Sequence, residues 1–170
     1  TVIVTNWCSM DISLIDTATD KVVATVPSTG IHPRGIAVSA DSRTAYIAVM
    51  GSDKIVALDI TKRTVRDFAS PGKRTRHLSI SPDGTRLYAT NSTSNTVVEL
   101  DTTNGEILRT VTVGAEPRSM AISADGGALY VVNYNASTMS KIRTSDFTVT
   151  HTVPTDGLPI GVTYEPTQKR

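Results

Sequence analysis

Cysteine and aromatic residues are scarce in this chain of 170 residues, which has one cysteine, one tryptophan and 5% aromatics. The lone Cys8 excludes an intrachain disulfide, a cysteine-based zinc site and haem attachment through Cys-x-x-Cys-His. No apolar run approaches the about 20 residues that a membrane-spanning helix needs. No set of axial ligands for a bound redox group is recognisable either. The sequence therefore predicts no membrane span, no metal site and no cofactor.

The chain also lacks a dominant charge and any helical pattern. Its 17 lysines and arginines nearly balance 16 aspartates and glutamates, so the net charge of +1 indicates no partner. No segment places apolar residues at helical spacing over three turns, which excludes a helix-rich fold. A Gly-x-Ser-x-Gly elbow and a glycine-rich phosphate loop are both missing, and we assign no catalytic residue.

A repeat with a period of 42 residues runs through the sequence. Residues 34–41 align without a gap with residues 76–83 and 118–125. The same spacing recurs at Tyr46, Tyr88 and Tyr130, and at Pro33, Thr75, Pro117 and Pro159. Agreement at so many positions in one register is very unlikely by chance, so the repeat defines the architecture.

Each repeat predicts four short strands. The pattern begins with residues 35–39, and in the next copy a Ser-Pro-Asp-Gly turn at 81–84 precedes a strand at 87–90. Further strands follow at 96–100 and 106–113. Helical repeats of similar length fail on pattern, and the Trp-Asp pair of WD40 repeats is absent. We therefore predict an all-β fold, a β-propeller of four-stranded blades with about four blades present. We interpret these blades as part of a larger propeller.

The second strand of each blade carries a family resemblance. Leu87-Tyr88-Ala89-Thr90-Asn91 and residues 129–133 are similar to the Tyr-Val-Thr-Asn motif, residues 3–6 vary it, and residues 46–49 lack the Asn. The chain thus resembles the YVTN family of propellers, which includes surface-layer proteins and usually has seven blades. The resemblance implies an extracytoplasmic location, whether periplasmic, secreted or on the cell surface. A non-enzymatic binding or interaction module is the leading prediction for the function, because the repeats differ little and a catalytic site normally forces divergent polar residues. Lactonase or lyase enzymes and cofactor-dependent dehydrogenase subunits remain the alternatives.

The repeats divide one propeller domain, residues 1–170, into units at about 2–33, 34–75, 76–117 and 118–159, with a last strand at 160–166. That strand has two predicted partners: residues 2–6 of the same chain, or another chain. Pairing with residues 2–6 would close a ring of four blades. We favour a segment of a larger ring, whose open blade ends allow self-association.

Three arginines occupy one position of the repeat, at the start of successive first strands: Arg34, Arg76 and Arg118. In a propeller these strands line the central channel, so the arginines should meet at its mouth, with Arg74 on the same rim. A guanidinium group is a planar fork of donors suited to phosphate or carboxylate. The alternative is structural, with each arginine held by a neighbouring loop.

Four further side chains fall on the same predicted face. His32 and His77, with Glu116, are candidate acid–base or metal groups, but their spacing matches no zinc motif. Trp7 is a candidate for stacking on a base or sugar, with packing inside its loop as the alternative. The predicted partner is a protein or an anionic ligand, and single-stranded nucleic acid is the polymeric candidate.

Overall fold

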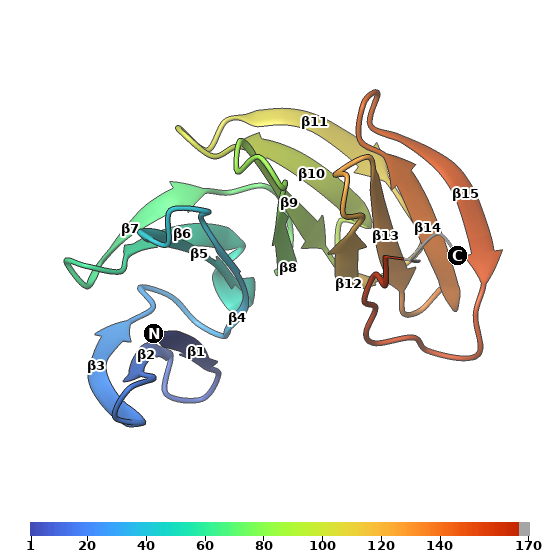
Figure 1. The fold of residues 1–170 in the computed structure, drawn as a ribbon. Helices are drawn as coiled ribbons and strands as arrows, with labels where there is room; N and C mark the ends of the chain where they lie inside the picture. The colour runs from blue at the N-terminus through green and yellow to red at the C-terminus, as the bar shows by residue number, and fades with distance from the viewer. Residues whose placement is uncertain (167–170) are drawn as a thin grey trace.

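The computed structural model describes residues 1–166, and its strands form four antiparallel sheets that follow one another along an open arc (Figure 1). This confirms the predicted all-β fold of propeller blades. The only helix in these residues is a single 3-10 turn, η1 (Met50–Ser52). Accordingly, residues 1–166 contain no helix with the length and apolar character needed to cross a bilayer.

The four sheets are named blades one to four in chain order. Blade one holds β1 (Val2–Asn6), β2 (Asp11–Asp16) and β3 (Lys21–Pro27). Blade two holds β4 (Pro33–Val38), β5 (Thr44–Val49), β6 (Lys54–Asp59) and β7 (Thr64–Ala69). Blade three holds β8 (Thr75–Ile80), β9 (Arg86–Asn91), β10 (Thr96–Asp101) and β11 (Ile107–Thr112). Blade four holds β12 (Pro117–Ile122), β13 (Ala128–Asn133), β14 (Thr138–Arg143) and β15 (Thr148–Pro154).

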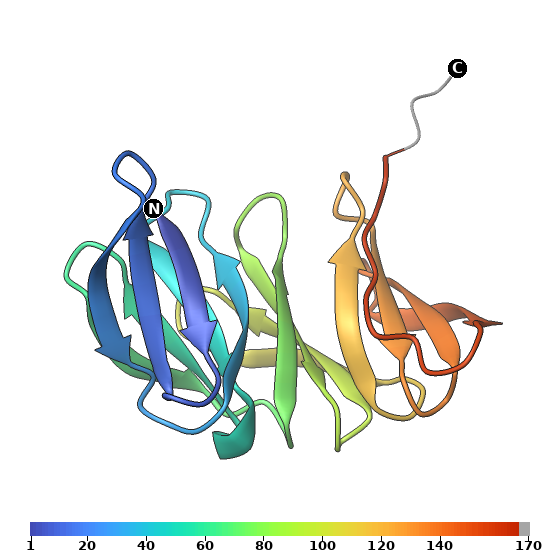
Figure 2. The same cartoon turned by 90° about the horizontal axis from the view of Figure 1, so that it is seen from below.

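The first strands of successive blades lie toward the inside of the arc, and the fourth strands lie outside (Figure 1). β4 packs against β8, and β8 packs against β12. The view turned by 90° shows these strands side by side along the row of blades (Figure 2). The predicted alignment of the three first strands along a common axis is therefore confirmed.

Apolar side chains fill the spaces between neighbouring sheets. Every residue of β5 after Thr44 is buried, because blades one and three cover its two faces. Tyr46 and Ala48 belong to the core shared with blade three, whereas Ala45 and Ile47 belong to the core shared with blade one. This alternation is the two-residue period of a strand, with both faces apolar because both are covered.

A repeated hydrogen-bonded turn joins the first and second strands. In blade three, Asp83 accepts from the Ser81 hydroxyl and the Thr85 amide, and the Ser81 oxygen accepts from the Arg86 amide. The hydrogen bond from Ser81 is the main cause that lowers the pKa of Asp83. Gly84 adopts a φ of 74°, as predicted for this turn. The sequence pattern thus specifies the turn chemically, through a serine, an aspartate and a residue of positive φ.

The predicted last strand is not formed. Residues 160–166 belong to no strand, and β1 pairs with β2 alone among the described residues. Tyr164 instead stacks on Tyr130 of blade four, with ring centroids 5.7 Å apart. In this structure the first and last blades lie at opposite ends of the arc, so β1 is out of reach of residues 160–166 (Figure 1). Of the two predicted partners, residues 2–6 are therefore not paired with this segment, and pairing with another chain stays a prediction.

The turn allows a test of backbone conformation in two blades. Ser42 occupies the position of Gly84 and adopts a φ of 57°. A Cβ at Gly84 would make an ordinary van der Waals contact with the Ala40 Cβ at 3.7 Å, so φ alone makes a side chain there unfavourable. Gly84→Ser should lower the free energy of unfolding by about 1 kcal/mol, whereas Ser42→Gly should not lower it. Chemical denaturation measures both, and equal stability of Gly84→Ser and the parent would contradict the argument.

Candidate functional site

The loop before the first strand of blades two, three and four is here called the leading loop, and the loop after β15 is its counterpart in the repeat. Each of these loops ends on a residue of positive φ at one repeat position: His32, Arg74, Glu116 and Leu158, with φ of 58°, 55°, 55° and 57°. The first three carbonyls accept a hydrogen bond from the residue after β5, β9 and β13, namely Met50, Ser92 and Tyr134. A residue with no preference for the left-handed conformation costs free energy at this position. Backbone strain of this kind clusters at functional sites, so the leading loops are candidates for function.

Side-chain bridges hold these leading loops in place. A side-chain oxygen from the loop between the second and third strands accepts from the amide of the positive-φ residue that lies 21 positions later. The pairs are Asp53 with Arg74 at 2.7 Å, Asn95 with Glu116 at 2.9 Å, and Ser137 with Leu158 at 3.3 Å. The starts of β8 and β12 are thereby fixed to the preceding blade, and Leu158 is fixed to blade four in the same way.

Each arginine then lies at a β-bulge. The pairing between first and second strands shifts between Pro33 and Ile36, between Thr75 and His77, and between Pro117 and Ser119. Arg34, Arg76 and Arg118 fall within these three shifts. A bulge leaves a residue out of the ladder and turns its side chain, so these bulges aim the arginines away from the inter-sheet cores.

Arg76 is the central member and has no carboxylate partner. Its residue is 9% exposed, and within residues 1–166 it forms no ion pair. Its Nη1 contacts the Met50 sulfur at 3.9 Å, and a thioether is a weak acceptor. Burial, followed by the charges of Arg34 and Arg118, lowers the pKa of Arg76 to about 10. The structure therefore brings the three predicted arginines into mutual electrostatic range, with a buried positive charge at the centre.

Arg34 lies over the only tryptophan of the sequence. Its Cζ is 5.6 Å from the Trp7 ring centroid, and His32 stacks on the same ring at 4.3 Å with an interplanar angle of 8°. Burial and the charge of Arg118 lower the pKa of Arg34. His32, from the leading loop of blade two, therefore covers one face of Trp7, and the stacking of a ligand on this ring stays a prediction.

Arg118 is the arginine of this set with a counter-ion. Its Nε and Nη2 both donate to Oε1 of Glu116, at 2.9 and 2.7 Å. Its Cζ also lies 3.2 Å from the ring centroid of Tyr134, a cation–π contact. Glu116 is thus committed to an arginine, which accounts for it without a metal. Among residues 1–166 no group of histidine, cysteine or acidic side chains is arranged to hold a metal ion.

His77 and Arg74 border the arginines from two sides. Burial is the main cause that lowers the pKa of His77, and the charges of Arg34 and Arg76 lower it further, so its imidazole is neutral at pH 7. Arg74 is exposed and lines a hollow of about 430 Å³ between the loops of blades three and four. The rest of that lining is mainly polar: Ser92, Thr93, Asn95, Ala115, Glu116 and Asn135.

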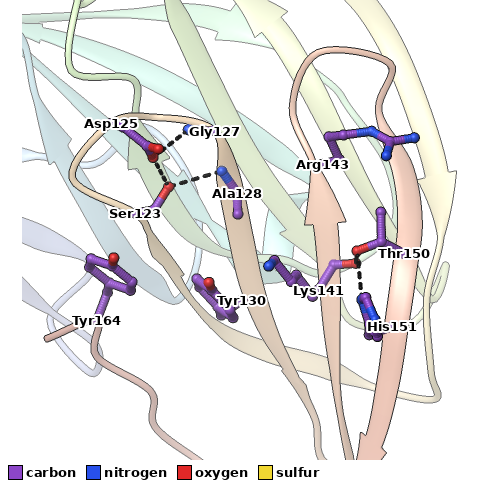
Figure 3. A pocket seen from close by; sticks show the side chains of 10 residues that line it. All are labelled: Ser123, Asp125, Gly127, Ala128, Tyr130, Lys141, Arg143, Thr150, His151 and Tyr164. Carbon is purple, nitrogen blue, oxygen red and sulfur yellow. Dashed lines mark hydrogen bonds between the residues drawn. The ribbon is translucent and has the colours of Figure 1, made fainter. Parts of the chain in front are cut away.

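A second hollow lies on the outer face of blade four, where Tyr130 and Tyr164 face each other beside Lys141 (Figure 3). Its position in the repeat indicates a packing surface. Tyr46 and Tyr88 are equivalent to Tyr130, and both contact the following blade: the Tyr46 hydroxyl donates to the Thr102 carbonyl, and Tyr88 stacks on Phe147. The equivalent face of blade four is therefore the face on which propeller blades stack, and we assign it no ligand.

The sequence identified the arginines but not their immediate partners. Met50, Tyr134 and the pairing of Glu116 with Arg118 were missed, because residues that follow the second strands differ in type from blade to blade. The bridges had a recognisable signal. Asp53, Asn95 and Ser137 recur at the 42-residue period, each a short side chain with an oxygen acceptor.

The fold defines a β-propeller. Its first strands β4, β8 and β12 carry Arg34, Arg76 and Arg118 near their starts, and these arginines form the mouth of the channel. The sequence model of the family described as "Lactonase, 7-bladed beta-propeller" matches residues 1–113. The chain belongs to this family. No curated protein sequence matches the chain.

Solved structures include a chain of similar fold, the Kuenenia stuttgartiensis hydrazine synthase. It superposes with a TM-score of 0.82 at 24% sequence identity, over 88% of the present chain and 44% of its own. The present chain therefore spans less than half the length of that relative. At this identity the likeness concerns the fold.

The uncompensated charge of Arg76 should cost stability. Its guanidinium is charged at every pH below about 10, and its burial beside two like charges opposes folding throughout that range. Arg76→Met keeps an unbranched side chain beside Met50 and should raise the free energy of unfolding by about 1 kcal/mol. Denaturation at pH 7 measures the change. A destabilised Arg76→Met protein would show instead that the arginine serves the fold.

Proposed function

We propose that the mouth formed by Arg34, Arg76 and Arg118 binds a ligand through its phosphate or carboxylate group, with Arg74 on the rim. The protein acts in this proposal as a binding module. The observation that carries it is Arg76, a buried guanidinium with no carboxylate partner in residues 1–166 and with two other arginines near it.

A bound anion would balance the unpaired positive charges of this mouth. Burying a charge is costly unless it is paired, and like charges nearby increase the cost. Arg34 and Arg76 form no ion pair with a carboxylate in the described chain, and bulges turn both out of the strand ladder. An anion placed between them would accept several charge-assisted hydrogen bonds at once.

A small anion fits these observations better than a nucleic-acid strand. Single-strand binding combines phosphate contacts with bases stacked on exposed aromatic rings. His32 stacks on Trp7, and Arg118 lies over Tyr134, so both aromatic rings near the arginines already have partners. Single-stranded nucleic acid is kept as an outcome of the test below.

The finer family assignment belongs to the same proposal. The Tyr-Val-Thr-Asn-like second strands support placement among YVTN propellers, and with it an extracytoplasmic role at the cell envelope. Residues 1–170 are then a single propeller domain or a segment of one, with its repeats at the 42-residue period. Fractionation of the native cells tests the location, and recovery with the cytoplasm would exclude it.

Binding of inorganic phosphate is the direct test. In low-salt buffer at pH 8, phosphate should raise the melting temperature of the parent as a saturable function of concentration. Arg76→Met should lose this response, and Arg34→Ala and Arg118→Ala should each weaken binding by about tenfold or more. Arg43→Ala is the matched control, because Arg43 is an exposed arginine in the turn at the opposite end of β4.

The same titration with single-stranded oligothymidylate tests whether the ligand is a nucleic-acid strand and not a small anion. If that strand binds, the slope of log affinity against log salt should fall by about 0.7 for each arginine removed. Equal phosphate binding by the parent and the three mouth variants would make these arginines structural and end the proposal.

Hydrolysis of a cyclic ester is a second candidate, favoured by the family and by His77. Its lowered pKa keeps the imidazole neutral and able to take a proton from water, with Arg34 and Arg76 near it to stabilise an oxyanion.

A panel of small lactones tests this activity. His77→Gln should abolish hydrolysis, and the parent rate should persist below pH 6.5, the ordinary pKa of histidine, because the His77 pKa is lowered from that value. Absence of hydrolysis by the parent would discard this candidate and leave the binding proposal standing.

A further inference from the structure

We infer that Glu116 is a built-in competitor for the anion site: its carboxylate occupies Arg118 in the ligand-free protein, and an incoming anion must displace it. Glu116 would then set the affinity of the mouth without being required for binding. This inference rests on the proposed function and identifies a residue that regulates the same site.

The carboxylate of Glu116 occupies the Arg118 donors that a bound anion would use. One oxygen, Oε1, accepts from both Nε and Nη2 of Arg118. The other, Oε2, has no hydrogen-bond partner among the described residues. The two side chains are 25% and 20% exposed, so an ion from solvent can reach the pair. An external phosphate or sulfate oxygen would approach Arg118 along the same two donors.

The backbone of Glu116 is fixed, so only its side chain has to move. Its amide donates to Asn95 Oδ1 and its carbonyl accepts from the Tyr134 amide, both at 2.9 Å. Glu116 also lines the hollow of about 430 Å³ beside Arg74. A change of side-chain rotamer can therefore move the carboxylate from Arg118 toward the hollow while the leading loop keeps its conformation.

The repeat supports a specific role for this acid. The equivalent residues of blades two and three are His32 and Arg74, so Glu116 is the acidic member of the set. Its charge lies close enough to raise the pKa of Arg76, in opposition to the neighbouring arginines. An anion centred on Arg76 would thus meet a free Arg34 on one side and an occupied Arg118 on the other.

Sulfate binding to Glu116→Gln tests the inference, with sulfate as a dianion at neutral pH. The amide keeps the size of the side chain and an acceptor for Arg118 but removes its charge, so sulfate affinity should rise roughly fivefold. Asp67→Asn is the matched control. Asp67 is an exposed acid on the outer strand β7, paired with Lys54 at 2.6 Å, and its removal should change the affinity less than twofold.

A double-mutant cycle separates displacement from general electrostatics. In an Arg118→Gln protein, Glu116 has lost the arginine that it pairs with. Adding Glu116→Gln should then give no further gain in sulfate affinity. An unchanged affinity for Glu116→Gln, or a gain that persists without Arg118, would overturn the inference. In either case, sulfate binding by the parent that Arg76→Met abolishes would leave the proposed function intact. If neither the parent nor Glu116→Gln binds sulfate at low salt, both proposals are wrong.

Discussion

The sheets of blades two and three are covered on both faces, and the rest of the structure depends on this packing. A second strand such as β5 has no side that meets water, so its residues are apolar or small in both directions. Strands near the axis and in the middle of each blade carry the cores, while the outer strands β3, β7, β11 and β15 remain largely exposed. The turn residues fix the length of each strand, and the period of the sequence keeps successive blades in one register.

A second set of constraints places the mouth of the channel. The oxygen acceptors of Asp53, Asn95 and Ser137 attach the leading loops of the following first strands to the preceding blades. This link explains how residues that are far apart in sequence act together: a loop of one blade positions the arginine of the next.

The charges of the mouth make binding and stability opposing requirements. Arg76 is enclosed by Met50 and by two other arginines, an arrangement that a protein built only for stability would replace with apolar residues. An anion that binds there relieves the repulsion, and Glu116 relieves part of it when no ligand is present. The same three groups thus account for the pKa of Arg76, for the proposed ligand and for its competitor.

The sequence by itself determined the repeat, the four strands of each full blade, the Ser-x-Asp turn and the equivalence of Arg34, Arg76 and Arg118. These follow from local patterns, because strand periodicity and turn chemistry act over a few residues and recur every 42. It did not determine that residues 160–166 remain outside any strand, since pairing depends on whether an edge lies within reach. Only the tertiary structure decided which arginine has a counter-ion. Trp7 follows β1, Met50 follows β5 and Tyr134 follows β13. Trp7 and Met50 contact Arg34 and Arg76 of the next blade, whereas Tyr134 contacts Arg118 of its own blade, a difference that only the packed structure shows.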